Sequence, residues 1–216
     1  MTDKKQSENN RQSRGPVQAR SQKRIDAAIA AAEELLVEVG PDKTSIPEIA
    51  SRADVPRTTI YQYFPDKYAL FAHMAESQYG RIADAIGEAT AGAENAHWRE
   101  LVGIVVEAVA AFYNANQVAA ILLLLGPFGS ADGAAHIEKD KLLADLFRAR
   151  LKLGSEGDGD TAPPLDRITL AIQIAFACLR WGYMLDGRLS PAIRAEAVRA
   201  TIAYITPFVE DGGRQS

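Results

Sequence analysis

The chain has 216 residues, of which 47% are hydrophobic and 24% are charged. This composition supplies enough apolar material for a buried core, so it excludes a wholly disordered chain. A single cysteine excludes a disulfide framework and a cysteine-rich zinc module, and the net charge of −4 taken alone argues against a nucleic-acid binder.

The charge is distributed unevenly along the chain. Residues 1–25 carry seven basic side chains against two acidic ones, whereas residues 76–216 carry 13 against 18. We therefore expect residues 1–20 to form a flexible basic tail in front of an acidic body. The tail lacks the apolar stretch of a signal peptide, and together with the single cysteine this predicts a cytoplasmic protein.

Apolar residues at helical spacing predict a first helix over residues 24–39, which Gly40 and the proline after it end. A short second helix is expected to begin at Ser45, whose spacing from Glu48 is that of a capping box. Pro47 falls in its first turn, where the missing N–H costs little. A third helix is expected over residues 57–63.

The remainder of the chain is also predicted to be helical. Asp66 is placed to cap a fourth helix, and five further helices are indicated by the helical period or by a cap followed by proline. They cover residues 101–112, 117–125, 137–147 and 165–185, with a last helix from Ser190 onward and a loop over 154–164. No alternating strand pattern is present, so the sequence predicts an all-α fold of about nine helices.

Residues 108–131 contain no charged side chain and are long enough to cross a membrane. However, Asn114, Asn116 and Gln117 interrupt this stretch, and its strongly apolar part is short. A pair of buried helices is therefore the better interpretation.

The interval from Ile46 to Ile60 predicts a helix, a tight turn and a second helix. The helical period directs Ile60 and Phe64 toward the supporting helix. It leaves six polar or aromatic side chains on the open side, namely Arg57, Thr58, Thr59, Tyr61, Gln62 and Tyr63. Arginine reads guanine in the major groove, while threonine, tyrosine and glutamine reach phosphates or base edges. For the two tyrosines, packing in the core is the alternative.

This run resembles the DNA-binding domain of the TetR (tetracycline-repressor-like) family of transcriptional regulators over roughly residues 21–72. The matching positions are Gly40, Thr44-Ser45-Ile46, Ile49-Ala50, Val55, Thr59-Ile60-Tyr61, Tyr63-Phe64, Lys67 and Leu70-Phe71. One departure is Pro56, where the family more often has a small capping residue such as serine. The start of the third helix would then rely on Asp54 or on water for its cap.

The resemblance implies a three-helix DNA-binding domain over residues 21–68 and a helical ligand-sensing and dimerisation domain over residues 69–216. It implies a sequence-specific regulator, most often a ligand-responsive repressor, that binds a palindromic operator as a homodimer. The implied phosphate contacts are Thr44, Thr59, Tyr61, Tyr63 and Lys67, the implied base readers are Arg57 and Thr58, and Gln62 suits either role. Ser45 completes the predicted DNA-binding set. Arg11, Arg14 and Arg20 would either reach a minor groove or belong to an unstructured tail.

A ligand cavity is expected among the helices of the C-terminal domain. The candidate lining residues are Trp98, Phe112, Tyr113, Asn116, Phe128, His136, Phe147 and Trp181, with plain core packing as the alternative for each. An apolar pocket with few polar groups would suit a hydrophobic or aromatic small molecule.

Catalysis, a metal site and a cofactor find no support in the sequence. The three histidines are isolated, and Cys178 lies on an apolar helix where an inert thiol is expected. The Gly/Asp-rich run at residues 154–160 lacks the ligand spacing of a calcium loop. Two alternatives remain: a DNA-bound structural or cell-cycle factor of the same fold without a small-molecule effector, and an enzyme within the helical body.

Overall fold

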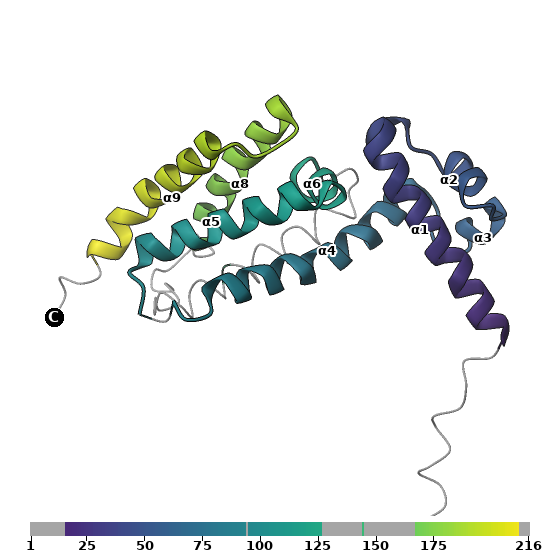
Figure 1. Ribbon diagram of the computed structural model, residues 1–216, viewed down its shortest axis with the longest axis horizontal. Coiled ribbons are helices and arrows are strands. Elements are labelled where there is room, and N and C mark those ends of the chain that lie inside the picture. The colour runs from purple at the N-terminus through teal and green to yellow at the C-terminus, as the bar shows by residue number, and fades with distance from the viewer. Residues whose placement is uncertain (1–15, 94, 127–143, 145–166, 212–216) are drawn as a thin grey trace, which may run out of the picture. The chain divides into compact units, whose positions relative to one another are not determined.

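The computed structural model describes residues 16–93, 95–126, 144 and 167–211 (Figure 1). The described backbone forms eight α-helices and no strand, so the predicted all-α class is confirmed and the number of helices is close to the predicted nine. The helices are α1 (Pro16–Lys43), α2 (Ile46–Arg52), α3 (Arg57–Tyr61), α4 (Lys67–Thr90), α5 (Trp98–Ala115), α6 (Gln117–Leu124), α8 (Arg167–Asp186) and α9 (Pro191–Asp211). The predicted helix at 137–147, apart from helical Ala144, and the loop at 154–164 lie outside the described residues.

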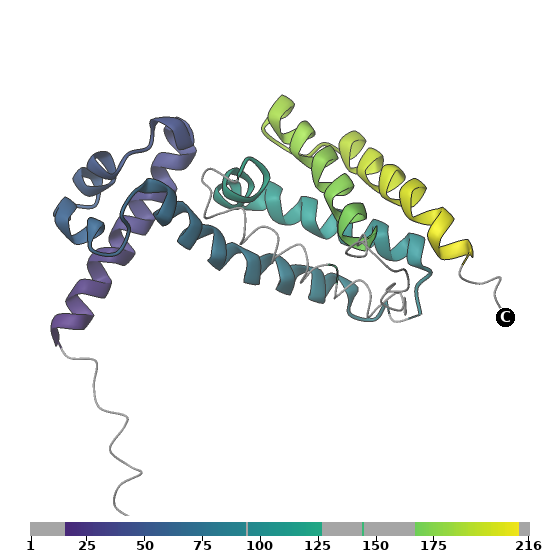
Figure 2. The same cartoon turned by 180° about the vertical axis from the view of Figure 1, so that it is seen from behind.

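The chain divides into two compact units, Met1–Lys67 and Tyr68–Ser216. In the first unit, α1 packs against α2 and α3, and α2 packs against α3 (Figures 1 and 2). Leu36, Ile49 and Ile60, one from each helix, are fully buried. Helices as short as α2 and α3 are unstable alone, so this shared core holds them in place.

Helix α1 begins earlier than the sequence predicted. The expected start was Arg24, and residues 1–20 were expected to be a tail, but the helix already begins at Pro16. Proline suits the first helical position, and neither glycine nor another proline follows before Gly40. The long helix breaks at Gly40, as predicted, because φ is 79° there, and one further turn runs through Lys43.

In the second unit, α8 and α9 lie antiparallel side by side, and α9 also packs against α5 (Figures 1 and 2). Gly182 makes the close approach of α8 to α9 possible, since a Cβ at this position would lie 2.5 Å from Ile193 Cγ1. The side chain of Asn114 bonds to both backbone polar groups of Leu189, accepting from N at 2.8 Å and donating to O at 3.0 Å. These bonds attach the turn between α8 and α9 to α5.

The uncharged stretch that suggested a membrane span is a bent pair of helices. Helices α5 and α6 meet at Asn116 with a bend of 116°. Arg180 of α8 donates to the carbonyl oxygens of Leu124 and Gly126, at 2.6 and 3.3 Å, and so satisfies the end of α6. Among the described helices, α8 is long and apolar enough to cross a membrane, a test that the core helices of globular proteins also pass.

Candidate functional site

The exposed face of α3 carries most of the predicted DNA-binding side chains. Ile60 and Phe64 are buried, 0% and 8% exposed, which confirms that they face inward. Tyr61 and Tyr63 are 48% and 49% exposed, so they are not core residues. The side chains of Arg57, Thr58 and Gln62 are also exposed, while Thr59 is half-buried. The helix ends at Tyr61, two residues before the predicted end, and Gln62 caps it.

A tight turn between α2 and α3 determines the direction in which α3 leaves the supporting helix. The N–H of Val55 donates to Ala50 O at 3.0 Å, and the N–H of Asp54 lies 3.5 Å from Ser51 O. This is a Schellman arrangement with Asp54 in the left-handed region at φ 52°. Asp54 therefore ends α2, and no side chain caps α3 at Pro56. Among the described residues no hydrogen bond from the Asp54 side chain to α3 is observed, so the structure does not support the predicted cap by Asp54.

Two of the predicted phosphate contacts, Thr44 and Lys67, bond to the end of α1. The Thr44 side chain is buried, and its hydroxyl donates to Gly40 O at 2.8 Å. The ammonium of Lys67 donates to Pro41 O at 2.9 Å and to Asp42 O at 3.0 Å. Carbonyls at a helix end need such partners, so both residues stabilise the polypeptide that leads into α2. Their role as phosphate contacts stays a prediction.

Ser45 caps α2, as the capping-box spacing predicted. Its Oγ accepts from the N–H of Glu48 at 3.4 Å and donates to Glu48 Oε2 at 2.8 Å. The capping box differs from the usual one in that the glutamate binds the serine hydroxyl. Pro47 lies in the first turn of α2. The N-terminus of α2 is therefore satisfied internally by the serine that was predicted to contact DNA.

A hydrogen bond that no sequence motif indicates joins the start of α1 to the residues after α3. The hydroxyls of Ser21 and Tyr63 lie 2.8 Å apart. Ser21 precedes the predicted helix and belongs to no motif. The one indication of this bond in the sequence is the prediction that Tyr63 lies on the open side of the third helix. The exposed side chains of Arg20, Lys23 and Arg24 lie within one turn of Ser21. Three exposed basic side chains are thus on the same stretch of α1 as Ser21, and the predicted arm residues Arg11 and Arg14 lie outside the described residues.

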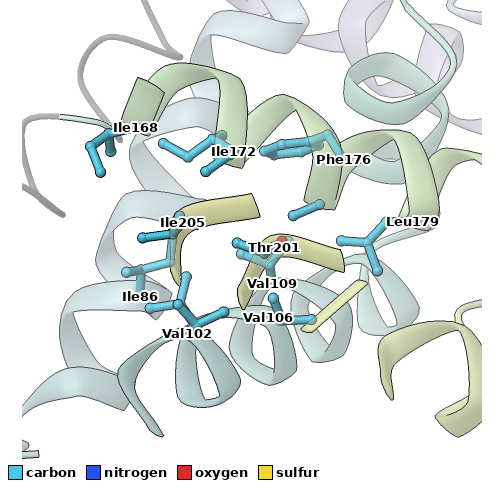
Figure 3. A pocket seen from close by; sticks show the side chains of 13 residues that line it. Ile86, Val102, Val106, Val109, Ile168, Ile172, Phe176, Leu179, Thr201 and Ile205 are labelled. Carbon is cyan, nitrogen blue, oxygen red and sulfur yellow. The ribbon is translucent and has the colours of Figure 1, made fainter. Parts of the chain in front are cut away.

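The second unit contains an apolar cavity of about 50 Å³ between α4, α5, α8 and α9 (Figure 3). Its described lining consists of aliphatic side chains apart from one phenylalanine and one threonine. The lining residues are Ile86, Val102, Val105, Val106, Val109, Ile168, Ala171, Ile172, Ala175, Phe176, Leu179, Thr201 and Ile205. The arrangement suits an apolar group and offers no charged side chain among the described lining residues.

None of the five described residues that were predicted to surround a cavity is among the lining residues of this one, and their role as ligand contacts stays a prediction. Phe112 and Tyr113 are core residues, and the Tyr113 ring packs edge-on against Phe176 with 6.3 Å between centroids. Asn116 accepts from Arg81 at 2.7 Å, holding α4 to the bend between α5 and α6. Trp98 stacks on Arg99 and Trp181 is 59% exposed. The three other candidates, Phe128, His136 and Phe147, lie outside the described residues.

Cys178 and Tyr183 are the titratable side chains of α8 that burial affects. Burial raises the pKa of the Cys178 thiol, and a nearby carboxylate, Glu196, raises it further. Burial likewise raises the pKa of the Tyr183 phenol. A raised pKa keeps a thiol protonated and therefore unreactive. Among the described residues, no group of three or more His, Cys, Asp or Glu side chains is placed to hold a metal ion.

The part of the chain that contains α3 is also the part that matches a known protein family. Residues 28–74 match the model of a family described as bacterial regulatory proteins, tetR family. This range contains α2, α3 and every predicted DNA-binding residue. No curated protein sequence is significantly similar to the chain.

Several solved structures share the fold over most of the chain. A TetR-family transcriptional regulator from Streptomyces coelicolor is 22% identical with a TM-score of 0.65, covering 87% of this chain and 98% of its own. The fatty acid degradation regulator FadR from Bacillus halodurans is 20% identical with a TM-score of 0.60, covering 90% and 97%. RolR in complex with resorcinol is 18% identical with a TM-score of 0.59, covering 92% and 96%. At these identities the likeness concerns the fold.

Proposed function

We propose that this chain, a member of the tetR family of bacterial regulatory proteins, is a DNA-binding transcriptional repressor whose operator affinity falls when a small molecule binds its second unit. One observation carries the DNA-binding part: within the residues that match the family, α3 buries Ile60 and presents Arg57 and Tyr61, and Tyr63 is exposed just after the helix. A helix that turns this chemistry outward suits the major groove. Such a regulator acts in the cytoplasm, where the DNA is.

We assign the contacts by exposure. Arg57 and Thr58, at the start of α3, are the proposed base readers, and Gln62 reaches either a base edge or a phosphate. Tyr61 and Tyr63 are the proposed phosphate contacts, with half-buried Thr59 beside them. Ser45, Thr44 and Lys67 hold the backbone that positions α2 and α3.

Fluorescence anisotropy with labelled DNA that flanks the gene tests this assignment. We expect Arg57→Ala to weaken binding by about 10- to 100-fold, because one good bidentate base contact contributes about 1–3 kcal/mol of discrimination. Arg188→Ala is the matched control, since Arg188 is an exposed arginine of the second unit. Equal affinities of wild type and Arg57→Ala for a specific fragment would contradict the role of α3.

The proposed repressor is a homodimer that binds a palindromic operator. Three large apolar side chains of α8 are strongly exposed: Trp181 (59%), Met184 (61%) and Leu185 (63%). A group of this kind on a water-facing helix is typical of an association surface. A dimer would also provide the two recognition helices, about 34–36 Å apart, that successive major grooves require.

Sedimentation velocity tests the dimer. The double variant Trp181→Glu, Leu185→Glu is expected to be monomeric at micromolar concentration, because it places two charges in the apolar surface. Val37→Glu is the control, since Val37 is an exposed apolar residue of α1 and is expected to leave the dimer intact. A monomeric wild type would contradict the proposal.

The cavity favours ligand response over a same-fold structural or cell-cycle factor that needs no effector. Among the relatives of similar fold, one is bound to resorcinol and one is a regulator of fatty acid degradation. A ligand would act here by stabilising the conformation that fits the operator less well, and the shift cannot exceed its difference in affinity for the two conformations. The proposal includes no catalytic activity.

A further inference from the structure

The hydroxyl of Tyr63, one of the proposed phosphate contacts, is bonded to the start of α1. Its oxygen lies 2.8 Å from the hydroxyl oxygen of Ser21, an ordinary length for an O–H···O hydrogen bond. Ser21 is half-buried, whereas Tyr63 is 49% exposed. Ser21 precedes the residues that match the family model, so the family likeness gives it no role. It is therefore a candidate functional residue outside the matched range.

The two hydroxyls share two protons, and this number limits what the pair can do. Each hydroxyl has one proton to donate and lone pairs that accept, while a phosphate oxygen only accepts. If Tyr63 donates its proton to a phosphate, none is left for Ser21, so Ser21 must donate to the phenol oxygen. A hydroxyl that accepts a hydrogen bond is polarised and becomes a stronger donor. In this arrangement Ser21 directs the phenolic proton outward and strengthens its bond to a phosphate.

The bond also restricts the movement of an exposed side chain. Tyr63 lies beyond the end of α3, and its ring is tilted by 45° to that of Phe64, with 6.5 Å between the centroids. The hydroxyl at its tip is held by Ser21. Immobilising a side chain when a complex forms costs conformational entropy, and a side chain that is already held avoids this cost. Ser21 therefore fixes the position of Tyr63 before DNA binds.

A basic side chain lies next to the two hydroxyls. Arg24 follows Ser21 by three residues on α1, a spacing that makes two helical side chains neighbours. Arg24 is exposed, and among the described residues no carboxylate forms an ion pair with it. The first acidic residue of α1, Asp26, accepts from Gln22 at 2.9 Å and lies five residues from Ser21, on another side of the helix. The charge beside the hydroxyls is therefore positive, which favours a phosphate.

We propose that Ser21, Tyr63 and Arg24 form one site for a backbone phosphate of DNA, in which Ser21 is a positioning residue. Ser21 donates to the Tyr63 oxygen, Tyr63 donates to the phosphate, and Arg24 adds a charge-assisted contact. The site deepens the DNA binding proposed above and rests on it. It extends the proposed interface from α3 to the start of α1, and because it contacts no base it adds affinity without sequence preference.

A double-mutant cycle on the labelled DNA that flanks the gene, measured by fluorescence anisotropy, tests the coupling of the two hydroxyls. We expect Ser21→Ala to weaken binding by about two- to tenfold, the usual contribution of one hydrogen bond, and Tyr63→Phe to weaken it at least as much. In the Tyr63→Phe variant, the further change Ser21→Ala is expected to have less than about a twofold effect, because Ser21 acts through the tyrosine hydroxyl. Equal effects of Ser21→Ala in the two backgrounds, or no effect in either, would overturn the proposal.

Two further variants at the start of α1 separate the hydroxyl from the helix that carries it. Gln22→Ala, like Ser21→Ala, introduces the best helix former, and it is expected to leave the affinity unchanged. Ser21→Thr keeps a hydroxyl at this position and is expected to bind within about twofold of the wild type. Circular dichroism confirms that each variant is folded. A threonine variant as weak as the alanine variant would contradict the role of the hydroxyl.

A phosphate contact also differs from a base contact in the DNA that it affects. Binding is therefore measured to a shuffled fragment of the same length and composition at low salt. Ser21→Ala and Arg24→Gln are expected to weaken binding to both fragments by the same factor, whereas Arg57→Ala weakens binding to the flanking fragment more. Arg24→Gln is also expected to lower the slope of the salt dependence by about 1, while Arg188→Gln keeps it. A loss confined to the flanking fragment in Ser21→Ala, or an unchanged slope in Arg24→Gln, would overturn the proposal.

The two proposals fail in different ways. If the wild type binds neither fragment, DNA binding itself is wrong and the phosphate site falls with it. If the wild type binds its flanking fragment and Arg57→Ala weakens this binding, but Ser21→Ala behaves as the wild type does, the role of α3 stands. Only the phosphate site at the start of α1 is then wrong.

Discussion

Both units of the chain combine an apolar core with polar groups at helix ends, but the first contains the two shortest described helices, α2 and α3. In the first unit, polar groups terminate the helices: Thr44 and Lys67 bond the end of α1, Ser45 caps α2, and Asp54 ends it in a left-handed conformation. In the second unit, long helices meet through apolar surfaces, and Gly182 brings α8 close to α9. Short helices need fixed ends to present one surface, whereas long helices are held by their faces and leave a cavity between them.

The largest expected effect comes from removing the ammonium that terminates α1. Lys67→Met is expected to lower the free energy of unfolding by about 1.5–3 kcal/mol, the usual contribution of hydrogen bonds to a charged group. Chemical denaturation measures this change, and Lys43→Met, at an exposed lysine of the same unit, is the control. Because the ammonium is engaged with two carbonyls, we expect the salt dependence of DNA binding to stay unchanged. A slope lower by about 1, with stability unaffected, would instead identify Lys67 as a phosphate contact.

In the second unit, the contribution of helix packing to stability is tested at the close approach of α8 and α9. Gly182→Ala is expected to lower the free energy of unfolding by about 1–3 kcal/mol, because the added methyl group would overlap the stiff side chain of Ile193. Gly80→Ala is the matched control: its Cβ meets open space on α4, and alanine is the better helix former, so this variant should gain up to about 1 kcal/mol. Equal stabilisation by both variants would show that α8 and α9 move apart to accommodate the methyl group at little cost in free energy.

Variants of Asp54 show whether the turn before α3 depends on the backbone conformation of this residue or on a contact of its side chain. Asp54→Val is expected to lower the free energy of unfolding by about 1–2 kcal/mol, since β-branched residues tolerate positive φ poorly. Asp54→Gly is expected to be neutral or stabilising, because glycine adopts this conformation without strain. Thermal unfolding of both variants makes the comparison, and a destabilised glycine variant would indicate that the aspartate side chain is needed.

The sequence predicted the first unit better than the second because its signals are local. Gly40 and Ser45 sit at fixed offsets from helix ends, and the burial of Ile60 and Phe64 follows from the helical period alone. The start of α1 was missed because residues 16–23 are mostly polar, and polar residues carry no apolar period. The Ser21–Tyr63 hydrogen bond joins residues 42 positions apart, which no local pattern encodes.

The cavity could not be predicted from the aromatic residues, because its described lining is almost entirely aliphatic. Bulky side chains such as Phe112 and Tyr113 fill space between helices, whereas the cavity lies where smaller aliphatic side chains leave space unfilled. Periodicity predicts which face of α5 or α8 is buried. The volume left between four such faces depends on how the helices cross, and that information is distributed over the whole unit.

The smallest expected effect concerns an ion pair on the surface of the first unit. Arg52 NH2 of α2 lies 2.7 Å from Glu38 Oε2 of α1, and this hydrogen bond holds the pKa of Glu38 below its ordinary value of 4.5. A carboxyl with a lowered pKa in the folded state contributes stability above the unfolded-state pKa and loses it as the pH falls through the folded-state pKa.

Thermal unfolding from pH 7 to pH 2 measures this contribution. We expect Arg52→Gln to be slightly less stable than wild type at pH 7, with the two converging below pH 4.5 as Glu38 is protonated. Arg24→Gln, at an exposed arginine of α1, controls for the loss of one positive charge. Both side chains of the pair face water, so the difference should also shrink in high salt. A difference that persists unchanged at low pH would assign the effect to packing of the arginine stem, and the polar contribution to this unit would then be confined to its helix ends.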